Sequence, residues 1–106
     1  MHASIRRTDP ATSAQVAADF HNLPIGRLTA RNQAAHIFVT DLHDLDAWLT
    51  ALGGHITRQR AGLGITIWTL HTATEPRSDG TRTTVLVHVP ALTHELVDPH
   101  LIAAVA

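Results

Sequence analysis

The chain contains no cysteine, and this absence excludes disulfide bonds, thiolate nucleophiles and cysteine-bound zinc or iron–sulfur sites. Lysine is also absent, so the eight basic residues are all arginine. Any metal site would therefore have to be built from histidine and carboxylate ligands.

Long apolar runs are missing as well. No stretch approaches the roughly 20 residues that a membrane-spanning helix needs, and no apolar stretch of signal-peptide length follows residues 1–7. We therefore expect a cytoplasmic protein without a membrane partner. The net charge is −1 with histidine neutral. Nucleic acid is not an expected partner, because nucleic-acid-binding domains usually carry a basic excess.

What the chain does contain fits one small globular domain. Its 106 residues suffice for a single core, and 44% of them are hydrophobic against 16% charged. The chain also has nine histidines. Because unperturbed histidine titrates near pH 6.5, we expect solubility and assembly to respond to mild acid.

The first predicted helix covers about residues 10–22. Asp9 can cap it, and Pro10 fits its first turn. The helical spacing i, i+4, i+7 predicts one apolar stripe for packing, formed by Val16, Phe20 and Leu23.

Two more helices are predicted further along the chain. Asp41 or Asp44 can cap the second, and Gly53-Gly54 ends it. Its apolar positions are Leu45, Trp48, Leu49 and Leu52. A short third helix over about residues 99–105 can begin at Asp98-Pro99, with Thr93 as a rival starting point.

Four segments rich in Ile, Val, Thr or Trp predict strands, at residues 36–40, 55–60, 64–71 and 83–89. A short strand around residues 27–29 is left open. The predicted fold class is α+β. It has a βαβββ core over about residues 36–89 with a mostly antiparallel four-stranded sheet, an N-terminal helix and a short C-terminal helix, in a single domain over residues 1–106.

Strand alternation sorts the residues of this sheet by face. One side, under the Trp48 helix, would hold Ile37, Val39, Ile56, Ile65, Ile67, Val85, Val87 and Val89. The other side would carry four large apolar residues among polar ones, namely Phe38, Trp68, Leu70 and Leu86. Such a surface is too apolar to stay in water, so we predict a partner or ligand face. A terminal helix, a second copy and a ligand are all possible covers.

The strand–helix–three-strand order, with His36-Ile37-Phe38-Val39-Thr40-Asp41 and then Asp46-Ala47-Trp48-Leu49 to Leu52-Gly53-Gly54, resembles one module of the vicinal-oxygen-chelate superfamily. This superfamily includes the glyoxalase and bleomycin-resistance proteins, and the resemblance covers about residues 36–89. It implies a metal ligand at His36, which matches the family's histidine on the first strand. At the family's second position, commonly a glutamate on the last strand, this chain has His88. The resemblance also implies a second module, from a tandem repeat or a second chain, to close the cavity.

Residue chemistry alone also allows a metal at His36 and His88, provided that their strands are neighbours. A divalent ion takes imidazole nitrogen, and two copies could supply four ligands. His55 is the third metal candidate. The alternative is that each histidine is a partly exposed strand residue without a ligand role. No catalytic residue is identified, because none of the serines has a nucleophile context.

The favoured function is therefore a small non-catalytic binding or regulatory module. It would form a homodimer or bind a protein partner through Phe38, Trp68, Leu70 and Leu86, without a cofactor. The first alternative is a metal-dependent lyase- or dioxygenase-like enzyme, or a drug-binding protein, of the vicinal-oxygen-chelate type with a divalent metal. The second alternative is a nucleic-acid accessory protein that would use Arg27 and Arg31.

Overall fold

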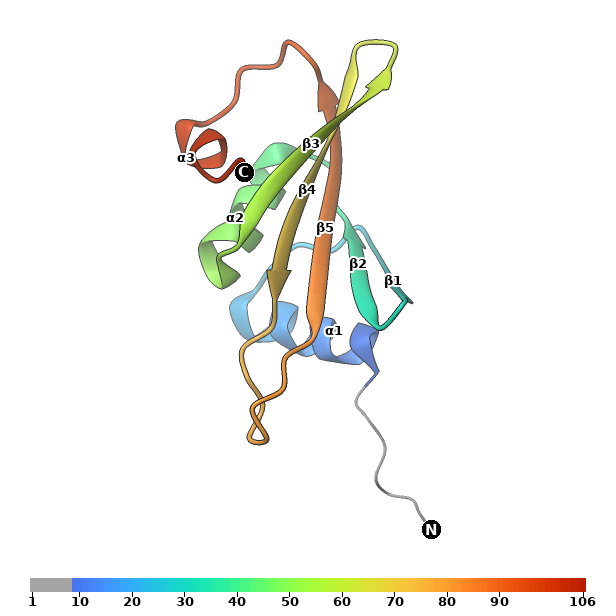
Figure 1. The fold of residues 1–106 in the computed structure, drawn as a ribbon, viewed down its shortest axis with the longest axis vertical. Helices are drawn as coiled ribbons and strands as arrows, with labels where there is room; N and C mark the ends of the chain where they lie inside the picture. Colours follow the sequence, from blue (N-terminus) through green and yellow to red (C-terminus); the bar gives the residue numbers. More distant parts are fainter. Residues whose placement is uncertain (1–8) are drawn as a thin grey trace.

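The computed structural model describes residues 9–106, so residues 1–7, on which the expectation about a signal peptide depends, lie outside the described part. None of the helices in this part is long and apolar enough to cross a membrane. The elements follow in the order α1 (Pro10–His21), β1 (Arg27–Arg31), β2 (Ala34–Phe38), α2 (Leu42–Leu52), β3 (His55–Gly62), β4 (Ile65–Ala73), β5 (Thr84–Leu92) and α3 (Pro99–Ala103) (Figure 1).

The strands form one mixed sheet in the order β1-β2-β5-β4-β3 (Figure 1). β2 and β5 run parallel, and the other three neighbouring pairs are antiparallel. The α+β class, the strand–helix–three-strand order from β2 to β5 and both terminal helices are confirmed. The sheet has five strands, however, and not the predicted four.

The additional strand is β1, which forms a hairpin with β2. Asn32 and Gln33 connect the two strands, and both have positive φ angles, of 52° and 63°. Two-residue hairpin turns demand such angles and usually place glycine there. Because neither residue is glycine, the turn has a weak sequence signal, and the pattern leaves this strand open.

Aspartate side chains cap the three helices in the predicted places. Asp9 accepts a hydrogen bond from the backbone N–H of Thr12 at the start of α1. Asp41, and not Asp44, caps α2, because it accepts from the N–H of Asp44 at 3.0 Å. Asp98 caps α3 in the same way.

The predicted apolar stripe of α1 was wrong at Val16 and Phe20, whereas Leu23, just after the helix, packs against the core. Val16 and Phe20 are 62% and 78% exposed, and the helix instead buries Ala14, Ala17 and Ala18. This face meets β2, whose first residues are also alanines. Small residues on both elements let their backbones approach closely, and the larger side chains of the helix are left outside.

All three helices pack against the same face of the sheet. Buried residues of α1, α2 and α3 join those of the strands in one hydrophobic cluster, and the strands pass in front of α1 and α2 in Figure 1. The fully buried Trp48 of α2 donates a hydrogen bond from Nε1 to the Pro24 carbonyl oxygen at 2.7 Å. Within residues 9–106, no terminal helix covers the second face of the sheet.

The face assignment of β4 also needs correction. Trp68 is 4% exposed and Leu70 is fully buried, so both lie on the helix side and not on the predicted partner face. Ile65 and Ile67 point to the other side. Both alternating sets of β4 contain apolar residues, so alternation alone does not decide its orientation. The pairing with β5 decides it, because Leu70 lies opposite the buried Val87.

Candidate functional site

The face of the sheet that the helices leave uncovered is here called the open face. Paired residues on neighbouring strands point to the same side, so the strand register identifies the side chains on this face. They include Arg27, Thr29, His36, Phe38, Leu86, His88, Pro90, Leu92, Ile65, Ile67, Thr69, His71, His55, Thr57 and Gln59. None of the nine Asp and Glu residues lies in a strand. The open face consequently carries no carboxylate from the five strands.

Four of these residues form a histidine row, defined as His36, His88, His71 and His55. They come from β2, β5, β4 and β3 in that order, so the row crosses four adjacent strands. All but His55 are half-buried. The parallel pairing of β2 with β5 brings the first two together, and the antiparallel register places the last two directly opposite each other.

Hydrogen bonds order the imidazole rings of this row. His36 Nδ1 and His88 Nε2 lie 3.0 Å apart, and the two ring planes are nearly parallel, at 7°, with their centres 5.2 Å apart. The other nitrogen of His88, Nδ1, lies 3.0 Å from the Thr69 hydroxyl. Thr57 makes a similar bond to His71 Nε2 at 2.8 Å. A bond between two imidazoles needs one ring to donate and the other to accept, so this arrangement suits neutral rings.

The protonated forms of two of these histidines are disfavoured. Burial is the largest cause that lowers the pKa of His88, and the charges of His36 and His71 add to it. Burial also lowers the pKa of His71, with a further contribution from His55. Both groups are therefore held in the neutral form to lower pH than an exposed histidine.

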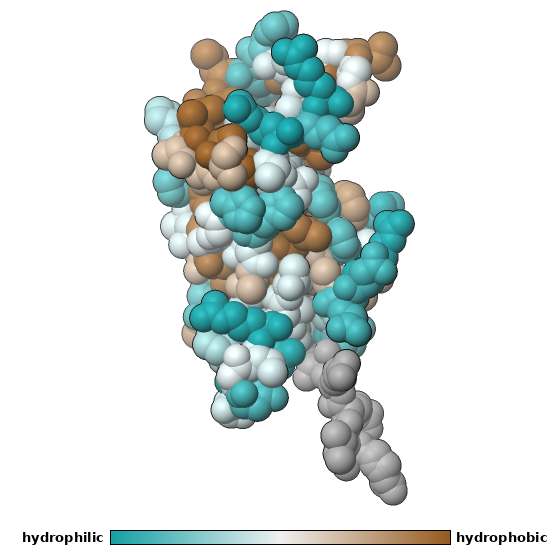
Figure 2. Space-filling view, viewed as in Figure 1, coloured by the Kyte–Doolittle hydropathy of each residue, from teal (hydrophilic) through white to brown (hydrophobic). Residues whose placement is uncertain are grey.

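Beyond the histidine row, toward the β3–β4 turn, the open face becomes apolar. This apolar end consists of Ile65, Ile67, Pro90 and Leu92. The two isoleucines are half-buried, and Leu92 is 63% exposed. Figure 2, which views this side of the sheet, shows hydrophobic and hydrophilic side chains interspersed. The open face is therefore neither uniformly polar nor uniformly apolar.

Two of the four residues predicted for a partner face lie on the open face. Phe38 and Leu86 do lie on the open face, with Phe38 36% exposed and capped by the Arg27 guanidinium at 4.9 Å from the ring centre. Trp68 and Leu70 do not lie there. Ile67 and His71 take their place, and sequence reasoning missed both because it assigned β4 the opposite orientation.

The structure places the metal candidates in two groups. His36 and His88 are neighbours, as the metal hypothesis requires. His55 lies instead beside His71, with ring centres 4.8 Å apart, on the same open face but at the β3 edge of the sheet. Among residues 9–106, no group of three or more His, Asp or Glu side chains is arranged to hold a metal ion. One chain therefore offers His36 and His88 as two donors, and a complete site would need a second copy.

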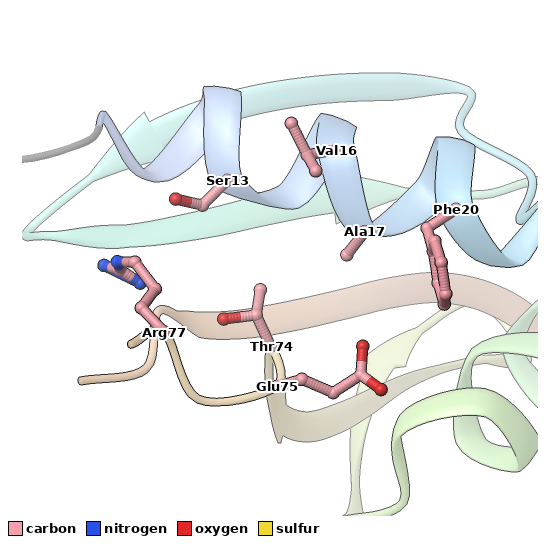
Figure 3. A pocket seen from close by; sticks show the side chains of 7 residues that line it. All are labelled: Ser13, Val16, Ala17, Phe20, Thr74, Glu75 and Arg77. Atoms are coloured by element: carbon pink, nitrogen blue, oxygen red, sulfur yellow. The ribbon is translucent and has the colours of Figure 1, made fainter. Parts of the chain in front are cut away.

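A separate groove of about 370 Å³ lies between α1 and the start of the β4–β5 loop (Figure 3). Phe20 and Val16 give it apolar walls on the helix side. Its charged groups are already engaged, because Glu75 contacts His21 at 3.1 Å and Arg77 donates to the Thr83 hydroxyl. Both charged groups of the groove therefore have partners within the chain, and the open face is the stronger candidate.

Comparisons of the chain with protein-family models, with curated proteins and with solved structures found no match.

Proposed function

We propose that this chain is a binding module that self-associates, with the open face of one copy packed against the open face of a second. The observation that carries the proposal is the one-sided layering of the fold. The helices of residues 9–106 cover one face, while half-buried apolar groups such as Ile67 and Leu86 remain on the other. Exposed apolar patches of this kind usually mark an interaction surface.

The size of the open face supports a second copy as the occupant. At about 4.8 Å between strands and about 3.3 Å per residue, two strands of five residues, one of eight and two of nine give a face of about 570 Å² in projection, near the roughly 600 Å² per partner at the lower limit of stable interfaces. Stable protein interfaces bury about 800 Å² on each partner. Two such sheets can pack face to face at about 10 Å, as in β-sandwiches.

The charge of the open face also suits a second copy. Its strands contribute no carboxylate, and burial lowers the pKa of His71 and His88, so two copies can meet without burying an unpaired acid. The arginines on this side, Arg27 and Arg31, belong to the edge strand β1. They would stay at the solvated rim of the interface, where charge is tolerated.

Replacing Ile67 by aspartate is expected to separate the copies. A carboxylate at the centre of β4 would be buried without a partner in the interface, so the dissociation constant should rise at least about 100-fold. Sedimentation velocity over a concentration series measures this change. The matched control is Val16→Asp, which makes the same kind of change on the exposed side of α1 and should leave assembly intact. A wild-type chain that stays monomeric at about 100 μM, a concentration where even weak dimers form, would sink the proposal.

A second candidate function is a metal-dependent enzyme or drug-binding protein of the vicinal-oxygen-chelate type. The specific observation in its favour is the 3.0 Å approach of His36 Nδ1 to His88 Nε2, on strands that the resemblance pairs as first and last. Two copies with these rings facing each other would provide four imidazoles, which is the number of ligands that zinc takes in a tetrahedral site. To act as a Lewis acid, the metal would also need an open coordination position for an oxygen ligand in addition to these imidazoles.

This second candidate predicts stoichiometric divalent metal in protein purified without a polyhistidine tag. His36→Ala should lower the metal affinity by more than about tenfold, because even outer-shell partners of a metal contribute that much. Elemental analysis after dialysis against a defined zinc concentration measures the effect. His43→Ala, an exposed histidine on α2, is the control and should retain the wild-type metal content. Metal-free wild-type protein, or equal metal in both variants, would rule this candidate out.

A further inference from the structure

We propose that the histidine row makes self-association depend on pH, so that two copies hold together while the imidazoles are neutral and separate on mild acidification. This inference rests on the proposed function, since it concerns the regulation of the same open face. Its basis is the arrangement of four titratable side chains on the surface that would be buried.

The His36–His88 pair can take up one proton more easily than two. With both rings neutral, one ring donates to the other across the 3.0 Å contact. One added proton leaves this bond in place, because a charged ring can still donate to a neutral one. A second proton turns both nitrogens into donors, which removes the bond and places two positive charges side by side. The pair therefore resists full protonation.

The side chains that face the histidine row from the neighbouring strands are uncharged or positive. β1 presents Thr29 and Arg27, β2 presents Phe38, β4 presents Ile67 and Thr69, β3 presents Thr57 and Gln59, and the neighbours on β5 are Leu86 and Pro90. None of these groups is acidic, and the charged groups that β1 presents on this face, Arg27 and Arg31, are both positive. The helices, with their acids, lie on the opposite side of the sheet. Protonation of the row would therefore add positive charge without any nearby counter-charge.

Pairing of two copies would bring their two histidine rows face to face. Each copy contributes four imidazoles to the interface, so protonation would confront two positively charged rows across a gap of about 10 Å with little water to screen them. Burial in the interface also disfavours the charged form further. The lowered pKa values of His88 and His71 in the single chain point in the same direction, since partial burial already acts on them. Lowering the pH must then favour the separated copies, which bind protons more readily.

The test measures the dimer dissociation constant by sedimentation velocity at about pH 8 and at about pH 5.5, on either side of the unperturbed histidine value. We expect dimer at the higher pH and an increase in the dissociation constant of at least about 100-fold at the lower pH, with unchanged circular dichroism. The double variant His36→Gln/His88→Gln keeps hydrogen-bonding groups but cannot be charged, and it should reduce this increase at least about tenfold. The double variant His43→Gln/His94→Gln, which changes two exposed histidines away from the row, should respond as the wild type does.

The outcomes separate the inference from the proposed function. A wild-type chain that is monomeric at both pH values would overturn the proposed function and this inference with it. A dimer that is equally tight at both pH values would overturn the inference alone. The inference would also fail if dissociation coincided with unfolding, or if the His36→Gln/His88→Gln and His43→Gln/His94→Gln variants had the same pH response.

Discussion

Replacing Leu70 by aspartate is expected to unfold the chain, although sequence alternation assigns this residue to the partner face. Leu70 is fully buried and lies between Ile56 and Val87 in the sheet, under the helices. Truncation of a buried leucine costs about 2–5 kcal/mol, and an unpaired buried carboxylate adds several more. The sum approaches the whole free energy of unfolding of a small domain, which is about 5–15 kcal/mol. Circular dichroism and urea denaturation at neutral pH would show the loss.

The informative control is Ile67→Asp, because it makes a similar change three residues earlier in β4 but on the open face. This variant should stay folded, with a free energy of unfolding of the monomer within about 1 kcal/mol of the wild type, and lose only self-association. The reverse result, a folded Leu70→Asp monomer beside an unfolded Ile67→Asp chain, would mean that the two faces of β4 are exchanged.

The positions Leu70 and Ile67 illustrate what could and what could not be predicted from the sequence. The helices could be predicted, since capping aspartates, Pro10 and Gly53 are local signals that mark helix boundaries directly. The orientation of β4 could not, because Ile65 and Ile67 alternate with Trp68 and Leu70, and both sets are apolar. Only the pairing with β5 selects one set for the core, and strand register is a property of the whole sheet.

The open face could be predicted from the sequence only in part. His36, Phe38, Leu86 and His88 alternate with the β-branched residues Ile37, Val85, Val87 and Val89, so their common face could be inferred from the sequence. The contact of His36 with His88 could not, since it depends on a parallel pairing between strands that are 52 residues apart in the chain. The role of α1 was missed because alanine contributes little to an apolar stripe, yet alanines form its buried face.

Trp48 is the second position where a large effect is expected. Its side chain is fully buried between α2 and the sheet, so Trp48→Ala should lower the free energy of unfolding by about 3–5 kcal/mol. Trp48→Phe keeps most of the ring but leaves the Pro24 carbonyl oxygen without its 2.7 Å hydrogen bond. Loss of one buried hydrogen bond should cost about 1–3 kcal/mol. Urea denaturation monitored by circular dichroism distinguishes the two variants.

Leu63→Ala serves as the control, because Leu63 is fully exposed in the β3–β4 turn and should change stability by less than about 0.5 kcal/mol. A loss below about 1 kcal/mol in Trp48→Ala would contradict the packing of α2 against the sheet.

The hydrogen bond from Trp48 to the Pro24 carbonyl oxygen also affects the open face. Pro24 lies two residues before Gly26, whose N–H bonds to the Phe38 carbonyl oxygen where β1 joins β2. Loosening Trp48 should therefore weaken the β1 edge, where Arg27 lies over the Phe38 ring, and reduce self-association in parallel with stability.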